Sequence, residues 1–198
     1  MHAYWALGLL ALRKGDLLRA LPLLERAVGI CQDADFPGFF SLMTADLGAA
    51  YVLGGRIADA VSLLTRGMEQ ALAMERVDSQ VLASLSLGEA QMLAGRLEDA
   101  HSLAERTLAL THERQERGHQ AYALRLIGAI AARREPSEHE SAEAYYRQAL
   151  ALAEELGMRP LQAHCRLGLG TFYVQTGCPE PARAVLTAAV ALYRDMER

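Results

Sequence analysis

Five glycines recur along this chain at nearly equal intervals, and this spacing limits the folds that the chain can adopt. They are Gly8, Gly48, Gly88, Gly128 and Gly170, so that three intervals are 40 residues and the last is 42. In four of the five units a second glycine follows seven residues later, as Gly55 follows Gly48. A fixed period of this length indicates a repeat protein in which each unit packs mainly against its neighbours.

Each unit is predicted to form two helices joined by a tight turn. The stretches "LGGRIADA" (53–60) and "LAGRLEDA" (93–100) show this turn in two successive units. Apolar residues recur at helical spacing on both sides of it, as Leu82, Leu85 and Met92 do before the second turn. The turn glycine suits the left-handed conformation that ends a helix. We expect about ten helices in five antiparallel pairs and no strands, with units at about 1–36, 37–76, 77–116, 117–158 and 159–198.

Capping residues and small residues support the same two-helix unit. Asp16 can cap the second helix of the first unit, and Pro179 suits the first turn of the last helix. In the fourth unit, where the turn is rewritten as "RREPSEHES", Ser137 and Glu140 have the spacing of a capping box. One position of every second helix is alanine, namely Ala20, Ala60, Ala100, Ala142 and Ala182. We expect these alanines and the recurring glycines to lie where helix backbones approach closely.

These residues resemble the tetratricopeptide repeat (TPR), a motif of two helices with small residues at fixed positions. The motif residues are Tyr4, Leu7, Gly8, Ala20, Leu24 and Ala27 in the first unit, and Leu169, Gly170, Tyr173, Ala182, Leu186 and Ala189 in the fifth. The resemblance covers the whole chain and implies an all-α, right-handed α-solenoid that forms a single domain over residues 1–198. The chain departs from the family in its longer period, since a TPR unit has about 34 residues, and in Gln91, which stands where an aromatic residue is expected.

The long period is similar to the TPR-like region of MalT-type bacterial regulators. The last two units, including "AYALRLIGAIAARRE", also resemble the C-terminal repeat region of bacterial proteins that join a class III adenylate or guanylate cyclase domain to a P-loop ATPase domain. This resemblance implies a regulatory segment of a larger signalling protein and carries over no catalytic residue. Because the first helix is short and no polar capping helix closes the array, we expect a fragment of a longer protein, with exposed solenoid ends that could self-associate.

Composition and motifs argue against several other classes of protein. The net charge of −4 is spread along the chain and provides no basic face for nucleic acid. The chain contains no run of about 18 apolar residues, which is the length that a membrane-spanning helix requires. Cys31, Cys165 and Cys178 are too few and too widely spaced for a disulfide framework or a zinc site, which favours a cytoplasmic location. No phosphate-binding loop or His-Glu-x-x-His motif occurs, so we expect no enzyme, no cofactor and no metal.

Two local clusters could carry chemistry, and each has a simpler explanation. His139 lies between Glu138 and Glu140, which suggests metal ligands, but a solvated turn before a capped helix explains the same residues. His164 beside Cys165 suggests a thiol nucleophile. Neighbours in a helix point in different directions, however, so that this pair lacks the contact that activation of a thiol requires.

Function is expected on the unrepeated residues of the first helices, which line the concave side of such repeat proteins. By the register of the repeat, this side presents Trp5, Leu9, Asp46, Ala49, Glu89, Tyr122, Arg125, Arg133, His164, Thr171 and Gln175. The alternative for each of them is that it only fills a gap between helices. The mixture of aromatic, acidic and basic groups predicts a protein or peptide partner, or another domain of the same polypeptide. A stand-alone peptide-binding adaptor and a small-molecule effector-sensing domain remain as alternatives.

Overall fold

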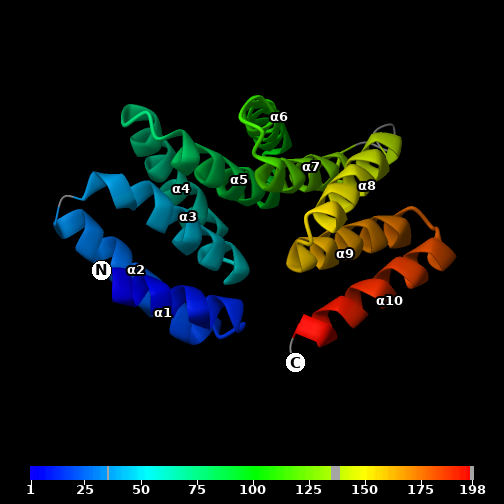
Figure 1. Ribbon diagram of the computed structural model, residues 1–198, viewed down its shortest axis with the longest axis horizontal. Helices are drawn as coiled ribbons and strands as arrows, with labels where there is room; N and C mark the ends of the chain where they lie inside the picture. Colours follow the sequence, from blue (N-terminus) through cyan, green and yellow to red (C-terminus); the bar gives the residue numbers. More distant parts are fainter. Residues whose placement is uncertain (35, 135–138, 197–198) are drawn as a thin grey trace. The chain divides into compact units, whose positions relative to one another are not determined.

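The computed structural model describes residues 1–34, 36–134 and 139–196, which form ten α-helices (Figure 1). The helices are α1 (His2–Arg13), α2 (Leu17–Asp33), α3 (Pro37–Leu53), α4 (Ile57–Ala73), α5 (Val77–Leu93), α6 (Leu97–Glu113), α7 (Arg117–Ala131), α8 (His139–Glu155), α9 (Arg159–Gln175) and α10 (Pro179–Met196). No strand occurs in these described ranges. The predicted all-α fold built from helix pairs is confirmed.

Residues in the left-handed conformation separate the helices at regular intervals. The turn glycines within the pairs have φ angles between 72° and 80°, as predicted, and they are Gly15, Gly55, Gly95 and Gly177. The turns between pairs use the same conformation: Gly157 has a φ of 66°, and Glu75 and Gln115 adopt 52° and 57° without being glycine. The same turn therefore recurs both inside a repeat and between repeats, and seven of the helices have the same length of 17 residues.

Two of the three predicted capping features are confirmed. The side chain of Asp16 accepts a hydrogen bond from the backbone N–H of Arg19, with an Oδ1 to N distance of 3.1 Å, and so caps α2. Pro179 is the first residue of α10, where its missing N–H costs nothing. The third feature, the capping box of Ser137 and Glu140, lies outside the described residues because Ser137 does.

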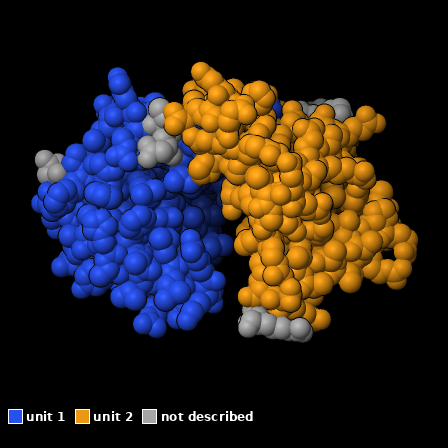
Figure 2. Space-filling view, in the orientation of Figure 1, with its two compact units in different colours: residues 1–103 blue, residues 104–198 orange. Residues whose placement is uncertain are grey.

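The chain divides into two compact units, which Figure 2 shows in different colours. Unit 1 covers residues 1–103 and contains α1 to α5 with the first part of α6, while unit 2 covers residues 104–198. Unit 1 has a core in which Leu24 of α2 packs with Met43 of α3. Unit 2 has a core in which Leu161 of α9 is fully buried. Each unit therefore buries apolar side chains of its own, and the single domain over 1–198 stays a prediction.

Small residues lie at the closest approaches between paired helices, as the sequence predicted. A Cβ atom added to Gly48 would lie 2.5 Å from Cγ of Leu64, and one added to Gly170 would lie 2.5 Å from Cγ of Leu186. The recurring alanine of the second helices is at most 2% exposed in all five units. A larger side chain at these positions would overpack the helix contact, which explains why the small residues recur.

Candidate functional site

Trp5 and Asp46, two of the residues predicted for the site, are in direct contact in unit 1. Trp5 is half-buried on α1, and its indole Nε1 donates a hydrogen bond to Oδ2 of Asp46 on α3 over 2.7 Å. The contact forms because α3 packs against both α1 and α5, which places the first helices of three successive repeats side by side. The repeat thus brings together two residues that are 41 positions apart.

The side chain of Asp46 is half-buried, and this burial disfavours the charged form of its carboxyl group. Burial raises the pKa of the Asp46 carboxyl above its ordinary value, because a half-buried carboxylate loses hydration. The hydrogen bond from Trp5 and the charge of Arg13 act in the opposite direction and lower that pKa. The second oxygen, Oδ1, accepts no hydrogen bond within the described part of the chain. A carboxyl whose pKa is shifted by burial beside a specific partner is a candidate functional group.

Apolar side chains and a second acid share the register of Asp46 on α3 and on the neighbouring first helix α5. On α3, Leu42 and Ala49 are half-buried and Leu53 is 68% exposed, and their spacing places them on the same side of the helix as Asp46. On α5, Glu89 is half-buried and Leu93 is 43% exposed. We call this surface of unit 1 the first-helix face; it consists of Trp5, Leu9, Leu42, Asp46, Ala49, Leu53, Glu89 and Leu93.

In unit 2, the predicted residues of the fourth repeat lie on its first helix, α7, or just after it. Tyr122 is half-buried and packs against the unit 2 core. Arg125 is also half-buried. Arg133 lies two residues beyond Ala131, the last residue of α7, and is exposed, and its Nη1 donates to the carbonyl oxygen of Ala129 over 2.9 Å. Arg133 therefore helps to terminate α7.

The predicted residues on α9 are exposed. The ring of His164 lies 6.1 Å from the ring of Tyr193 on α10, measured between centroids. Its neighbour Cys165 is buried, and burial raises the pKa of the Cys165 thiol to about 11. The two side chains point in different directions, as predicted, and the thiol is not activated. Thr171 and Gln175 are exposed, and the Thr171 hydroxyl donates to a carbonyl of its own helix over 2.9 Å.

The structure also describes part of the surroundings of His139. Its ring packs edge-on against that of Phe172, with a centroid distance of 5.3 Å, while Glu138 lies outside the described residues. Among the residues that are described, no three His, Cys, Asp or Glu side chains gather closely enough to hold a metal ion. No helix within the same ranges is both long and apolar enough to cross a membrane.

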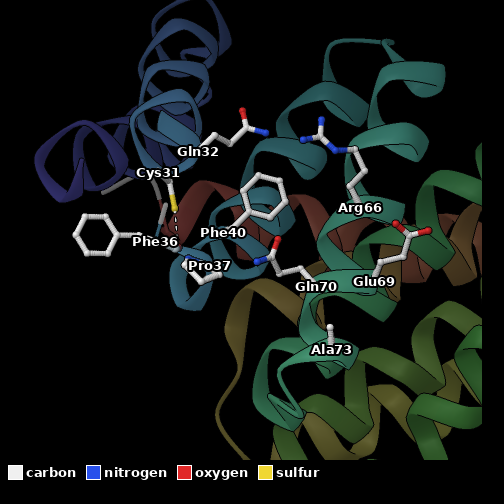
Figure 3. Close-up of a pocket in the computed structure, with 9 residues that line it drawn as sticks. All are labelled: Cys31, Gln32, Phe36, Pro37, Phe40, Arg66, Glu69, Gln70 and Ala73. Atoms are coloured by element: carbon white, nitrogen blue, oxygen red, sulfur yellow. Dashed lines mark hydrogen bonds between the residues drawn. The ribbon is translucent and has the colours of Figure 1, made fainter. Parts of the chain in front are cut away.

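A cavity of about 550 Å³ lies in unit 1 and is lined by none of the residues predicted for the site. Figure 3 shows its lining, which is Cys31, Gln32, Phe36, Pro37, Phe40, Arg66, Glu69, Gln70 and Ala73. These residues come from the end of α2, the start of α3 and the second half of α4. The sequence does contain a signal for this place: the repeat has glutamine at positions 80, 120 and 162, where the first junction has Phe40.

A second cavity, of about 590 Å³, lies in unit 2 against the outer side of α10. It is mostly apolar, and its lining is Val174, Pro179, Ala182, Arg183, Leu186, Thr187, Val190, Ala191 and Arg194. Val190 is 46% exposed, whereas Val28, at the equivalent position of α2, is 5% exposed beneath α3. The surface that successive repeats cover elsewhere is therefore open on α10.

Comparison with known proteins establishes the fold. No protein-family model matches the chain, and no curated protein matches it either. The TPR-like repeats of a kinesin light chain candidate from Podosopora anserina align over 100% of this chain and 96% of that chain, with a TM-score of 0.66 and 19% identity. A Rap protein complexed with Competence and Sporulation Factor aligns over 97% of this chain and 54% of its own, with a TM-score of 0.82 and 14% identity.

The Rap conjugation gene regulator of the plasmid pLS20, in complex with a Phr peptide, gives a TM-score of 0.79 at 18% identity over 98% of this chain and 53% of that chain. The fold is that of a TPR-like repeat solenoid. The resemblance to tetratricopeptide repeats that the sequence indicated is thus confirmed at the level of fold. This chain spans about half the length of each of these two Rap chains.

Proposed function

We propose that this chain is a protein–protein interaction module and that the first-helix face of unit 1 binds a peptide segment of its partner. The observation that carries this proposal is Asp46, a half-buried carboxylate with a raised pKa, held by Trp5 on a face of first helices. The other four units have Ala6, Ser86, Leu126 and Gly168 at the equivalent position. Packing of the repeat therefore does not require a charge there, and binding of a cationic partner gives it a reason.

The chemistry of the first-helix face favours a peptide that is both cationic and apolar. A lysine or arginine side chain of the peptide reaches Oδ1 of Asp46, which is the oxygen that Trp5 leaves unused. Glu89 supplies a second negative charge on the neighbouring helix. Apolar side chains of the peptide cover Leu53 and Leu93, which are 68% and 43% exposed. Such a combination of apolar anchors and a few charged contacts is typical of peptide recognition.

The structural neighbours support a peptide as the partner. Two of the Rap structures described above contain a bound peptide, Competence and Sporulation Factor in one and a Phr peptide in the other. We extend the proposal to unit 2, where Tyr122, Arg125, Arg133, His164 and Gln175 supply aromatic, cationic and polar groups on first helices or at their ends.

We further propose that the module acts within a larger bacterial signalling protein in the cytoplasm and has no enzymatic activity of its own. The support is the resemblance of the last two units to the repeat region of cyclase–ATPase proteins and that of the long period to MalT-like regulators. A stand-alone peptide-binding adaptor is the alternative. The sequence of the full gene decides between the two, because a cyclase or ATPase domain on the same polypeptide is required by the first and absent in the second.

Self-association through the repeat array is a second candidate property, and the open side of α10 favours it. Val174 and Val190 there are 60% and 46% exposed, and Tyr4 and Leu7 on α1 are 42% and 49% exposed. Exposed apolar patches of this kind often take part in protein contacts. Sedimentation velocity over a range of concentrations tests this property, and a monomer at all of them would contradict it.

Trp5 provides a direct test of peptide binding, because it is the single tryptophan of the chain. Arrays of 12-residue peptides would be screened first, with cationic–apolar, acidic–apolar and neutral sequences represented equally. Hits would then be titrated in solution while the fluorescence of Trp5 is followed. We expect cationic–apolar peptides to bind and to change this fluorescence, because the bond between the indole and Asp46 lies in the bound surface.

Asp46→Asn is the decisive variant, and Asp33→Asn is its matched control. Both remove one negative charge from unit 1, but Asp33 is an exposed residue at the end of α2, outside the first-helix face. We expect Asp46→Asn to weaken binding at least about tenfold, since a hydrogen bond to a charged group contributes about 1.5–3 kcal/mol. Equal loss in both variants, or no binding by any peptide class, would refute the proposal.

A further inference from the structure

The cavity between α2, α3 and α4 coincides with a break in the repeat. At the junctions that lead into α5 and α9, a glutamine near the start of the first helix binds the end of the preceding second helix. Gln80 Nε2 donates to the carbonyl oxygen of Ala71 over 3.3 Å, and Gln162 Nε2 donates to that of Ala153 over 3.1 Å. At the first junction this glutamine is replaced by Phe40, which is 6% exposed.

The replacement changes what the junction presents. The carbonyl oxygen of Cys31, which corresponds to those of Ala71 and Ala153, accepts the backbone N–H of Phe36 over 3.1 Å. The thiol of Cys31 donates to the carbonyl oxygen of Phe36, also over 3.1 Å, so that the backbone groups of this turn are satisfied. No side-chain hydrogen bond from position 40 is therefore needed at this turn, and the ring of Phe40 forms an apolar wall of the cavity.

Two charged side chains of the cavity, Arg66 and Glu69, form no ion pair within the described residues. Within the described part of the chain, Arg66 has no ion pair and no side-chain hydrogen bond, and its guanidinium carbon lies 5.6 Å from the centroid of the Phe40 ring. Glu69, one turn further along α4, has no ion pair in the same ranges either. Other arginines do pair, as Arg56 does with Glu25 over 2.8 Å. The cavity thus holds a positive and a negative group that face solvent beside an aromatic ring.

Two amides complete the polar part of the lining. In Figure 3 the head group of Gln32 on α2 and that of Arg66 on α4 point toward one another, with the Phe40 ring just below them in this view. The carboxylate of Glu69 lies on the Arg66 side, and Gln70 projects toward Pro37. Both glutamines are without a side-chain hydrogen bond in the described part of the chain, so each can donate to a ligand and accept from it.

We propose that this cavity binds a free α-amino acid with an apolar side chain. Its carboxylate lies against Arg66 with Gln32 as a second donor, its ammonium group lies against Glu69, and its side chain packs on the ring of Phe40. A purely anionic ligand would meet the charge of Glu69, and a purely cationic one would meet that of Arg66. A zwitterion satisfies both, and a volume of about 550 Å³ is typical of small-molecule sites. The site would make unit 1 a sensor of amino acids.

This inference goes beyond the proposed peptide binding and does not rest on it. None of the first-helix face residues lines the cavity. Asp46→Asn is therefore expected to leave amino-acid binding unchanged, while Arg66→Gln is expected to leave peptide binding unchanged. Failure of one proposal would be visible without failure of the other.

The test is an NMR titration of the ¹⁵N-labelled full chain with four matched probes. L-Phenylalanine carries both charges, 3-phenylpropanoate lacks the ammonium group, 2-phenylethylamine lacks the carboxylate, and N-acetyl-L-phenylalanine imitates the end of a peptide. We expect saturable shifts of amides at the ends of α2 and α4 with L-phenylalanine, and binding at least about fivefold weaker for each of the other three probes. Equal binding of the acetylated probe would overturn the proposal in favour of a peptide carboxylate.

Variants locate the site. Arg66→Gln and Glu69→Gln change exposed side chains and are each expected to weaken L-phenylalanine binding at least about fivefold. Arg26→Gln, an exposed arginine of α2 outside the cavity, is the control and should bind as the natural chain does. Phe40→Gln restores the residue of the other junctions and should abolish binding. The proposal is wrong if L-phenylalanine causes no saturable shifts up to about 10 mM, or if the control loses as much affinity as Arg66→Gln.

Discussion

The packing of the helix pairs makes a strong prediction about one substitution at two places. Gly48 on α3 and Gly29 on α2 both lie inside helices of unit 1. A Cβ atom at Gly48 would lie 2.5 Å from Cγ and Cδ2 of Leu64, whereas at Gly29 nothing lies within 4 Å of the added atom. Gly48→Ala and Gly29→Ala are therefore the same chemical change with and without a steric conflict.

The expected magnitudes follow from two opposing effects. Alanine is more favourable than glycine inside a helix by about 1 kcal/mol, and this gain applies at both positions. At Gly48 it is opposed by overpacking, which costs about 1–3 kcal/mol and should be near its upper limit because Leu64 is 0% exposed and has no room to move. We expect Gly29→Ala to stabilise the chain by about 1 kcal/mol and Gly48→Ala to destabilise it by about 2 kcal/mol.

A second substitution tests whether Leu64 is the cause. Leu64→Ala alone should cost about 2–5 kcal/mol, because it leaves a cavity in the core. In that background the methyl group at position 48 has space, so that Gly48→Ala should become neutral or stabilising. The sign of its effect would thus reverse between the two backgrounds, which is a coupling that only neighbouring residues show.

Urea denaturation followed by far-ultraviolet circular dichroism measures these free energies, with the slope of each transition compared to confirm that the variants unfold alike. A thermal scan provides an independent measure, in which 2 kcal/mol corresponds to a shift of about 4–8 °C for a chain of this size. If both glycine variants are stabilised, or if the loss at Gly48 persists unchanged in the Leu64→Ala background, the close-packing explanation for the recurring glycines is wrong.

Three further predictions concern ionisation, thiol reactivity and backbone strain. Burial raises the pKa of the Asp46 carboxyl, so the folded chain binds a proton at Asp46 more readily than the unfolded chain does. The ionised carboxylate therefore lowers stability near neutral pH. This cost disappears as the pH falls through the raised pKa toward about 3.9, the ordinary pKa of aspartate. Urea titrations should therefore show Asp46→Asn to be more stable than the natural chain near pH 7, with the gap closing by about pH 4; a gap independent of pH would contradict this. Ellman's reagent should label one thiol of the folded protein rapidly, that of exposed Cys178, because the other two are buried with raised pKa values; a second rapid equivalent would disagree with the structure. Glu75 has a φ of 52°, so Glu75→Gly should raise the thermal midpoint by removing about 1 kcal/mol of strain, whereas Glu69→Gly inside α4 should lower it; equal effects would argue against the left-handed turn.

The helix pairs could be predicted from the sequence because their cause is local and repeated. A turn glycine such as Gly55 tolerates a φ of 72°, and a leading glycine such as Gly48 permits a close approach, so both leave a periodic trace. The turns between pairs leave a weaker trace. Glu75 and Gln115 adopt the left-handed conformation without being glycine, because packing holds the helices on both sides. The turn propensities of single residues do not contain this information, so these two turns are harder to predict.

Contacts between repeats were harder to predict than the repeats themselves. By the period of 40, the residue of α3 that is equivalent to Trp5 is Ala45. Trp5 nevertheless binds Asp46, the residue that follows Ala45. The difference is the offset between adjacent helices, which a period in the sequence does not encode. The cavity at Phe40 depends on three helices at once and was missed for the same reason, and the site residues in both units stay predictions.

Repeated and unrepeated positions should respond to substitution in opposite ways. Gly48 recurs in every unit because packing requires it, so Gly48→Ala should reduce stability and leave the affinity of the folded fraction for ligands unchanged. Asp46 and Phe40 both lie on α3, and both depart from the repeat. Asp46 introduces a half-buried charge. Phe40 replaces a glutamine that, at two other junctions, donates a hydrogen bond to a backbone carbonyl. Neither is needed for the pairing of helices, since other units fold with different residues there. Natural proteins accept such local costs mainly where function requires them. Substitutions at Asp46 and around Phe40 should therefore change binding more than stability, and this separation, if measured, would support the proposal that α3 carries function in unit 1.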